Sequence, residues 1–179
     1  MEQEKQKTEE ELAAKIMEYS RDELMISMRF LDRALFRMPL VAADSVAAFG
    51  VDGATMYYNP EYVLHAFKKE KNACTRAFLH MILHCIFSHP FQYEKMDREC
   101  WDLATDLAVE QSIMDLNLKC VELERDASLK RTLSHLAQKV PILTAEKIYR
   151  WLYENPEESA EFFREEPQFM WDDHLKWIP

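Results

Sequence analysis

The chain has 179 residues, of which 48% are hydrophobic and only two are glycine, and its formal net charge at pH 7 is −10. This length and composition predict one compact, helix-rich domain with its own core, and they exclude a linker-like or low-complexity chain. The acidic balance argues against nucleic acid or an anionic membrane surface as the main partner, because both attract clusters of Lys and Arg.

The cysteines and the apolar runs bear on the cellular compartment. The four cysteines show no Cys-x-x-Cys spacing, and we interpret them as reduced thiols rather than a disulfide framework. The first residues are polar and acidic, unlike a signal peptide. No apolar run reaches the ~18 residues that a membrane span needs. We therefore expect a cytoplasmic protein with no membrane partner.

The N-terminal segment is strongly acidic before an apolar pattern begins. We expect residues 1–7 to be disordered and a single domain to span residues 8–179. Thr8 and Glu11 form a capping box, and apolar residues then recur at helical spacing. The first part of the domain, residues 8–37, is therefore predicted to be helical.

Residues 45–58 carry the clearest β signal in the chain. Two short runs, 45–51 and 54–58, flank the dipeptide Asp52-Gly53, which is typical of a two-residue hairpin turn. Both glycines of the chain fall in this region. The pattern predicts a β-hairpin.

Helices dominate the rest of the predicted domain. Asn59 and Pro60 are typical of an N-cap and a first helical turn. Residues 73–116 are expected to form an apolar helix that carries histidines, from about residue 73 to 88, and an acidic helix, from 98 to 116.

The C-terminal third is more polar. Residues 117–140 are charged and are expected to be irregular or weakly helical. Residues 141–179 are predicted to form short helices and an aromatic tail, 169–179. We expect this tail to dock on the domain, because its Phe and Trp side chains have a large apolar area to bury.

Two histidines in the apolar helix point to a metal site. His80 and His84 are spaced i, i+4 and lie on one helical face. Two imidazoles so placed can hold one divalent ion, as in the H-E-x-x-H zinc helix. A zinc site needs a third protein ligand, and Asp106 is the first candidate, with Asp102 and Glu110 one turn to either side.

Each of these residues also has a simpler interpretation. Paired histidines on an apolar helix can be hydrogen-bonded core residues, and an acidic helical face can be a solvated surface. His89 lies near the same side of the histidine helix. It is either a further ligand or a terminal residue that interacts with the helix dipole.

The position of the expected general base is occupied by Met81. In H-E-x-x-H peptidases the residue after the first histidine is the glutamate that polarises water. A thioether cannot take that proton, and general-base catalysis is worth typically ~10²–10⁴-fold. Glu110 is the candidate for a replacement base.

The order of these segments resembles a metallopeptidase-type domain found before a von Willebrand type A-like (VWA-like) domain in many bacterial proteins. The resemblance runs from about residue 40 to the end, and the segment 172–177 resembles the part that closes that domain. The positions that match the family pattern are Tyr58, Asn59, Pro60, His80, His84, His89, Trp101 and Asp106. Two features depart from it: the glutamate is Met81, and no VWA-like domain follows residue 179.

The resemblance implies an α+β fold that is mainly helical. It would be a compact, gluzincin-like zinc-peptidase fold with a small β-hairpin sheet beside the histidine helix. One zinc ion would be bound by His80, His84 and Asp106, with His89 and Asp102 as possible additional site residues. The family also implies linkage to a MoxR-type AAA+ ATPase and to a VWA-like domain.

Compact peptidases of this shape bind an extended peptide along a sheet edge. The edge residues here are expected to be Ser45, Phe49, Tyr57 and Tyr58. A competing arrangement, which we favour, has the aromatic tail covering that edge.

Three functions remain open from the sequence. The leading hypothesis is a catalytically inactive pseudoenzyme that acts as a metal-binding or protein-binding regulatory module. The first alternative is an active zinc-dependent peptidase with Glu110 as a displaced base. The second is a purely structural helical domain without metal.

Overall fold

The computed structural model describes residues 2–92, 94, 96–165, 170–172 and 174–177. It is mainly helical with one small sheet, which confirms the predicted α+β class. The first half contains α1 (Glu2–Ser27), η1 (Arg29–Leu31), α2 (Asp32–Arg37), β1 (Leu40–Ala42), β2 (Phe49–Val51), β3 (Met56–Tyr58), α3 (Pro60–Lys69) and α4 (Ala73–Ile86). The second half contains η2 (His89–Phe91), α5 (Arg98–Leu116), η4 (Lys119–Val121), α6 (Asp126–Lys139), α7 (Ala145–Glu154), α8 (Pro156–Glu165) and η6 (Leu175–Trp177).

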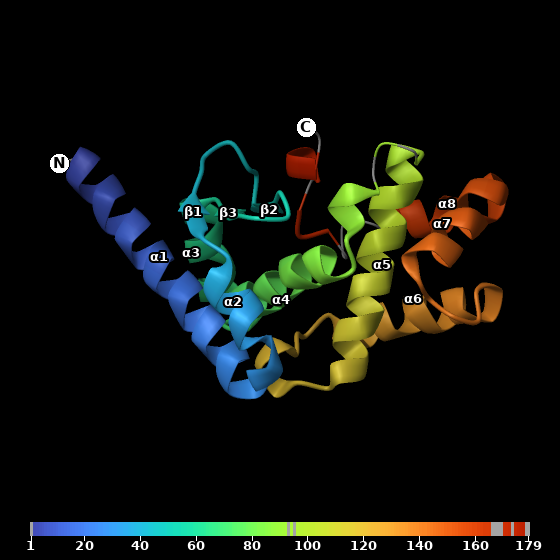
Figure 1. Ribbon diagram of the computed structural model, residues 1–179, viewed down its shortest axis with the longest axis horizontal. Coiled ribbons are helices and arrows are strands. Elements are labelled where there is room, and N and C mark those ends of the chain that lie inside the picture. Colours follow the sequence, from blue (N-terminus) through green and yellow to red (C-terminus); the bar gives the residue numbers. More distant parts are fainter. Residues whose placement is uncertain (1, 93, 95, 166–169, 173, 178–179) are drawn as a thin grey trace.

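Helix α5 stands between two hydrophobic cores (Figure 1). Val109 and Ile113 join a first core built mainly from α1, the sheet, α3 and α4. Leu103 and Leu107 join a second core built with α6, α7 and α8. The C-terminal tail returns to the middle of the molecule and lies near α5 and β2 in the view of Figure 1. The histidine helix α4 therefore meets α5 at the boundary between the cores.

The sheet has the order β1-β3-β2. The central strand β3 pairs parallel with β1 and antiparallel with β2. The hairpin between β2 and β3 was predicted, but β1 was not. A run of three residues, Leu40–Ala42, is too short to give a period-2 signal of its own.

The hairpin turn is centred one residue later than predicted. The Asp52 N–H donates to the Thr55 carbonyl (3.3 Å), so Gly53 and Ala54 are the central residues. Gly53 has φ +90°, and a Cβ there would lie 2.7 Å from a ring carbon of Phe91. The Asp52 carboxylate accepts from the Ala54 and Thr55 N–H groups and thereby fixes the turn.

Two segments are more regular than the sequence predicted. Helix α1 begins at Glu2, so residues 2–7 are helical rather than disordered. Residues 126–139 form the regular helix α6, which buries Leu129, Leu133 and Leu136. Their spacing of i, i+4, i+7 is a helical pattern that the surrounding charges concealed.

Other element boundaries agree with those predicted from the sequence. The Asn59 side chain accepts from the Tyr62 N–H (3.1 Å) and caps α3, with Pro60 as its first residue. Helix α5 has the predicted bounds and is capped by Asp97. None of the helices in the described part of the chain is both long and apolar enough to cross a bilayer.

Candidate metal centre

Three predicted ligands meet between α4 and α5. The Nε2 atoms of His80 and His84 are 2.8 Å apart, and Asp106 Oδ1 lies 3.0 Å from the first and 3.2 Å from the second. All three side chains are buried. The i, i+4 spacing on α4 places both rings on the face turned toward α5, as the sequence predicted.

The spacing of these atoms fits one metal ion. One ligand atom from each of the three residues lies within 4.8 Å of the other two. Tetrahedral zinc with ligands at ~2.0–2.2 Å has ligand atoms about 3.3–3.6 Å apart. The distances here are slightly shorter, so a small outward movement of the rings makes room for an ion.

The second nitrogen of each imidazole already has a partner. His80 Nδ1 lies 2.8 Å from Glu110 Oε1, and His84 Nδ1 lies 3.1 Å from His89 Nδ1. Metal-binding histidines commonly engage their other ring nitrogen in this way, which fixes the ring orientation. His89 thus contacts a candidate ligand instead of joining the three.

Glu110 is held by four donors. Its Oε1 atom also accepts from the Trp171 indole N–H (3.0 Å), and its Oε2 atom accepts from Nε (3.2 Å) and Nη2 of Arg76. Burial raises the pKa of Glu110, but the hydrogen bond with His80 and the charge of Arg76 outweigh it and lower the pKa to about 2. Glu110 is therefore an ionised, fully engaged residue behind His80, on the far side from Nε2. This position does not suit the replacement base expected as an alternative.

The tail adds a histidine that sequence reasoning missed. His174 Nδ1 lies 3.1 Å from Asp102 Oδ1, and its Nε2 lies 3.3 Å from Asp106 Oδ1. The ring is buried and stacks on Trp177, with centroids 3.9 Å apart. The available signal was a histidine beside aspartates in an otherwise aromatic tail, the segment 172–177.

The pKa values of the groups around Asp106 are coupled through hydrogen bonds and charges. Burial lowers the pKa of both His80 and His174, but hydrogen bonds and charges of nearby carboxylates raise each pKa above its usual 6.5. Burial opposes ionisation of Asp106, yet the charge of His174 and the hydrogen bonds of His80 and His84 hold its pKa well below 3.8. Burial and the charge of His80 lower the pKa of His84 well below 6.5. These shifts favour protonation of His80 and His174 beside Asp106, the carboxylate whose charge a bound cation would also balance.

The family of the chain follows from a comparison with known protein families. A family model described as "Putative metallopeptidase domain" matches residues 16–169. The chain belongs to this metallopeptidase-domain family. No curated protein and no solved structure shows significant similarity to it. The match spans the histidine helix and α5, which together carry His80, His84 and Asp106.

In this metallopeptidase-domain chain, the residue that follows His80 is Met81 and not a carboxylate. Met81 is fully buried and belongs to the first hydrophobic core, together with Ala77 and Leu79 on the same helix. Its side chain therefore fills apolar space and offers no proton acceptor to the centre.

The predicted peptide-binding edge is partly different from expectation. Strand β3 is central, so Tyr57 and Tyr58 do not lie on a sheet edge. Phe49 lies on the edge strand β2, where it forms a parallel bridge with Asp172 of the tail. Ser45, in the preceding loop, accepts a hydrogen bond from Lys176 Nζ (3.3 Å). The tail thus covers this edge, as favoured from the sequence.

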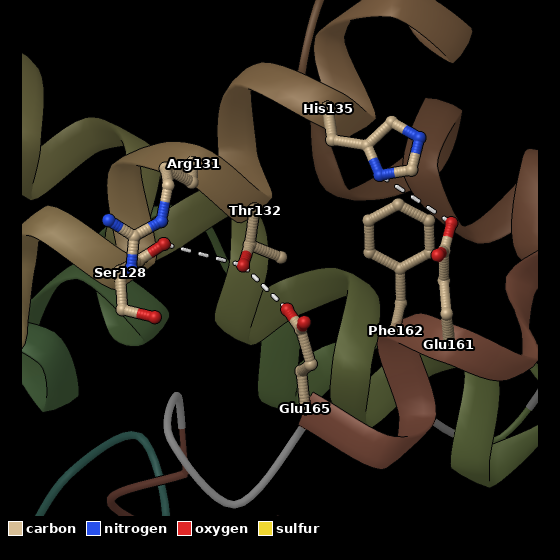
Figure 2. A pocket seen from close by; sticks show the side chains of 7 residues that line it. All are labelled: Ser128, Arg131, Thr132, His135, Glu161, Phe162 and Glu165. Atoms are coloured by element: carbon tan, nitrogen blue, oxygen red, sulfur yellow. Dashed lines mark hydrogen bonds and ion pairs between the residues drawn. The ribbon is translucent and has the colours of Figure 1, made fainter.

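A pocket lies between α6 and α8, far along the chain from the histidine helix (Figure 2). It has a volume of about 380 Å³ and is lined by Ser128, Arg131, Thr132, His135, Glu161, Phe162 and Glu165. Thr132 Oγ1 donates to Glu165 (2.5 Å), and His135 Nδ1 lies 3.5 Å from Glu161. The His135 and Glu161 side chains are 45% and 51% exposed, so water solvates the pair. These features are those of a surface depression, and the buried centre remains the functional candidate.

Proposed function

We propose that the chain is a metallopeptidase-like domain that binds one zinc ion through His80, His84 and Asp106 and has no peptidase activity. The observation that carries the proposal is the convergence of three buried donor atoms between α4 and α5. Two imidazoles and one carboxylate are a donor set that suits zinc.

The chain's own residues prepare the site for a cation. Glu110 engages His80 Nδ1 and leaves Nε2 directed to the centre, while His89 does the same for His84. A bound ion would act as a Lewis acid and balance the charge of Asp106. Arg76 and Trp171 keep Glu110 in place through hydrogen bonds.

Two features support inactivity. Met81 stands where a peptidase needs a general base, and Glu110 lies on the opposite edge of the His80 ring. The candidate ligands are also shielded: His80 and His84 are 0% exposed, and the Trp177 ring lies 5.0 Å from that of His84. The described residues thus shield the centre from a peptide carbonyl.

A domain of this kind would serve as a regulatory or binding module in the cytoplasm. Its net charge of −10 disfavours nucleic acid and anionic membranes, which leaves proteins and peptides as the partner class. A VWA-like domain and a MoxR-type AAA+ ATPase are the partners that the family resemblance suggests.

The test is the metal content of the full chain purified without added zinc, together with its thermal unfolding. We expect about one ion per chain and a higher unfolding temperature when zinc is added. A ligand at a hundredfold excess over its dissociation constant stabilises by ~2.7 kcal/mol. His80→Ala is expected to abolish binding, whereas the exposed His135→Ala serves as the matched control.

A protein without metal, with an unfolding temperature that zinc leaves unchanged, would favour the purely structural alternative. Zinc-dependent cleavage of unfolded substrates such as casein by the unmodified chain would favour the active peptidase.

A further inference from the structure

The described tail residues, 170–172 and 174–177, contact β2, α4 and α5 around the centre. Asp172 bridges to β2, and the Trp171 indole donates to Glu110 on α5. The Arg125 guanidinium lies 4.3 Å above the Trp171 ring. The Trp177 ring packs 5.0 Å from that of His84 on α4. The tail is thus built into the centre from several sides.

The backbone of the tail turns sharply at His174. This residue has φ +54°, in the left-handed region that a non-glycine residue rarely adopts. The Asp172 carboxylate accepts from the His174 N–H (2.7 Å) and stabilises the turn. Trp177 then stacks on the imidazole. The His174 ring is therefore fixed by its backbone and by a neighbouring ring.

His174 repeats the arrangement of the first ligand on α4. In both residues Nδ1 faces a carboxylate of α5: Glu110 for His80 and Asp102 for His174. In both, Nε2 faces Asp106. A carboxylate behind an imidazole is the usual support of a metal-binding histidine.

The Nε2 atom of His174 is buried and makes no hydrogen bond within the described structure. It lies 3.3 Å from Asp106 Oδ1 but is not aligned with it as a donor. A buried ring nitrogen without a hydrogen bond is costly, and an ion bound between it and Asp106 would satisfy it.

We propose that His174 supplies the fourth ligand of the ion held by His80, His84 and Asp106. This inference rests on the proposed function and adds whether the zinc site is of the structural or the catalytic class. Structural zinc sites are closed by four protein ligands, whereas catalytic sites keep one position open for water or substrate. The tail then takes the position that a peptidase leaves open, and the ion fastens the tail to α4 and α5.

The first measurement uses the unmodified protein with zinc. X-ray absorption at the zinc edge counts imidazole ligands: three are expected if His174 binds, and two if it does not. The optical spectrum of the cobalt-substituted protein is expected to show the intense bands of a four-coordinate site.

The second measurement uses the full chain with His174→Ala, His174→Gln, His80→Ala and the control His135→Ala. Zinc affinity is measured by competition with a chelator, and folding by circular dichroism. Both His174 variants are expected to bind zinc at least ~10–100-fold more weakly, which is the effect of losing even an outer partner. Adding imidazole to His174→Ala is expected to restore the cobalt spectrum.

The outcomes separate the two proposals. Two imidazoles in the zinc spectrum, with unchanged affinity in His174→Gln and lost affinity in His80→Ala, would overturn the fourth ligand and leave the three-residue site standing. Wild-type affinity in His80→Ala would overturn the proposed function itself.

Discussion

His80 Nδ1 lies 2.8 Å from Glu110 Oε1, so the carboxylate supports the imidazole from behind. The buried guanidinium of Arg76 faces the same carboxylate. Glu110 therefore joins the candidate ligand to a buried cation, and neutralising it affects both.

Glu110→Gln is expected to destabilise the protein strongly. The substitution keeps the shape of the side chain but leaves the buried Arg76 with only the more distant carboxylate of Asp126 (3.7 Å) as a counter-charge. Breaking a buried ion pair by removing one partner costs up to ~3–5 kcal/mol. Denaturant unfolding of the metal-free protein measures this loss. Glu158→Gln is the control, because its pair with Lys139 (2.9 Å) is exposed and screened by water. Equal stability of the two variants would contradict the supporting role of Glu110.

Met81→Glu is expected to depend on zinc. The new carboxylate would be buried in an apolar core, where an unpaired charge is costly. A bound cation nearby offsets that charge, so zinc should recover part of the lost thermal stability. Met81→Leu, which conserves volume, should cost less than ~1.5 kcal/mol and show no such zinc dependence. A zinc effect of the same size in both variants would argue against a metal beside residue 81.

Zinc affinity is expected to rise with pH above 6.5. The pKa values of His80 and His174 are raised in the metal-free protein, and an imidazole must lose the Nε2 proton before it binds metal there. The same raised pKa values stabilise the metal-free fold below pH 6.5, and this contribution is lost as the pH rises through them. Stability above pH 6.5 should therefore fall without zinc and rise with it. Calorimetry in buffers of different ionisation enthalpy measures the released protons. An affinity that does not change with pH would contradict the assignment.

Removal of residues 170–179 is expected to destabilise the domain and expose β2. Trp171 and Trp177 are each only 5% exposed, and losing one buried Trp side chain costs ~3–5 kcal/mol. Thermal unfolding and protease sensitivity measure the effect. Deletion of residues 1–7 is the control, since Glu4, Gln6 and Lys7 are exposed. A truncated chain as stable and protease-resistant as the full one would refute the covering role of the tail.

Local signals in the sequence predicted most of the helices and strands that build the first core, and they predicted three candidate ligands. The bounds of α5 and the cap at Asn59 follow from capping chemistry and helical spacing. The i, i+4 spacing alone was enough to predict His80 and His84 as ligands. The prediction of Asp106 also required the assumption that α4 and α5 pack face to face. Strand β1 was missed because a three-residue strand depends on its pairing with β3. The regularity of α6 was missed because the surrounding charges concealed the helical spacing of its leucines.

The role of His174 was hidden for a similar reason. It lies 68 positions after Asp106 by residue number, and no spacing rule links a tail to a helix so distant in sequence. The signal that remained was chemical: a buried imidazole needs polar partners, and a docked aromatic tail would carry this one inward.

The burial of α5 against both cores has a consequence for how sequences of this kind can vary. Asp102, Asp106 and Glu110 follow one another at i, i+4, i+8, and each faces an imidazole. Asp102 faces His174, Asp106 faces Nε2 of His80, and Glu110 faces Nδ1 of His80. One inserted residue in an α-helix turns everything beyond it by about 100° and shifts it by ~1.5 Å. An insertion before Asp102 would turn all three carboxylates away from their partners, while an insertion between Asp106 and Glu110 would leave the first two in place and detach Glu110 from His80 and Arg76. Length changes in α5 should therefore be far rarer among related sequences than point substitutions, and the loops that flank the helix should absorb insertions instead.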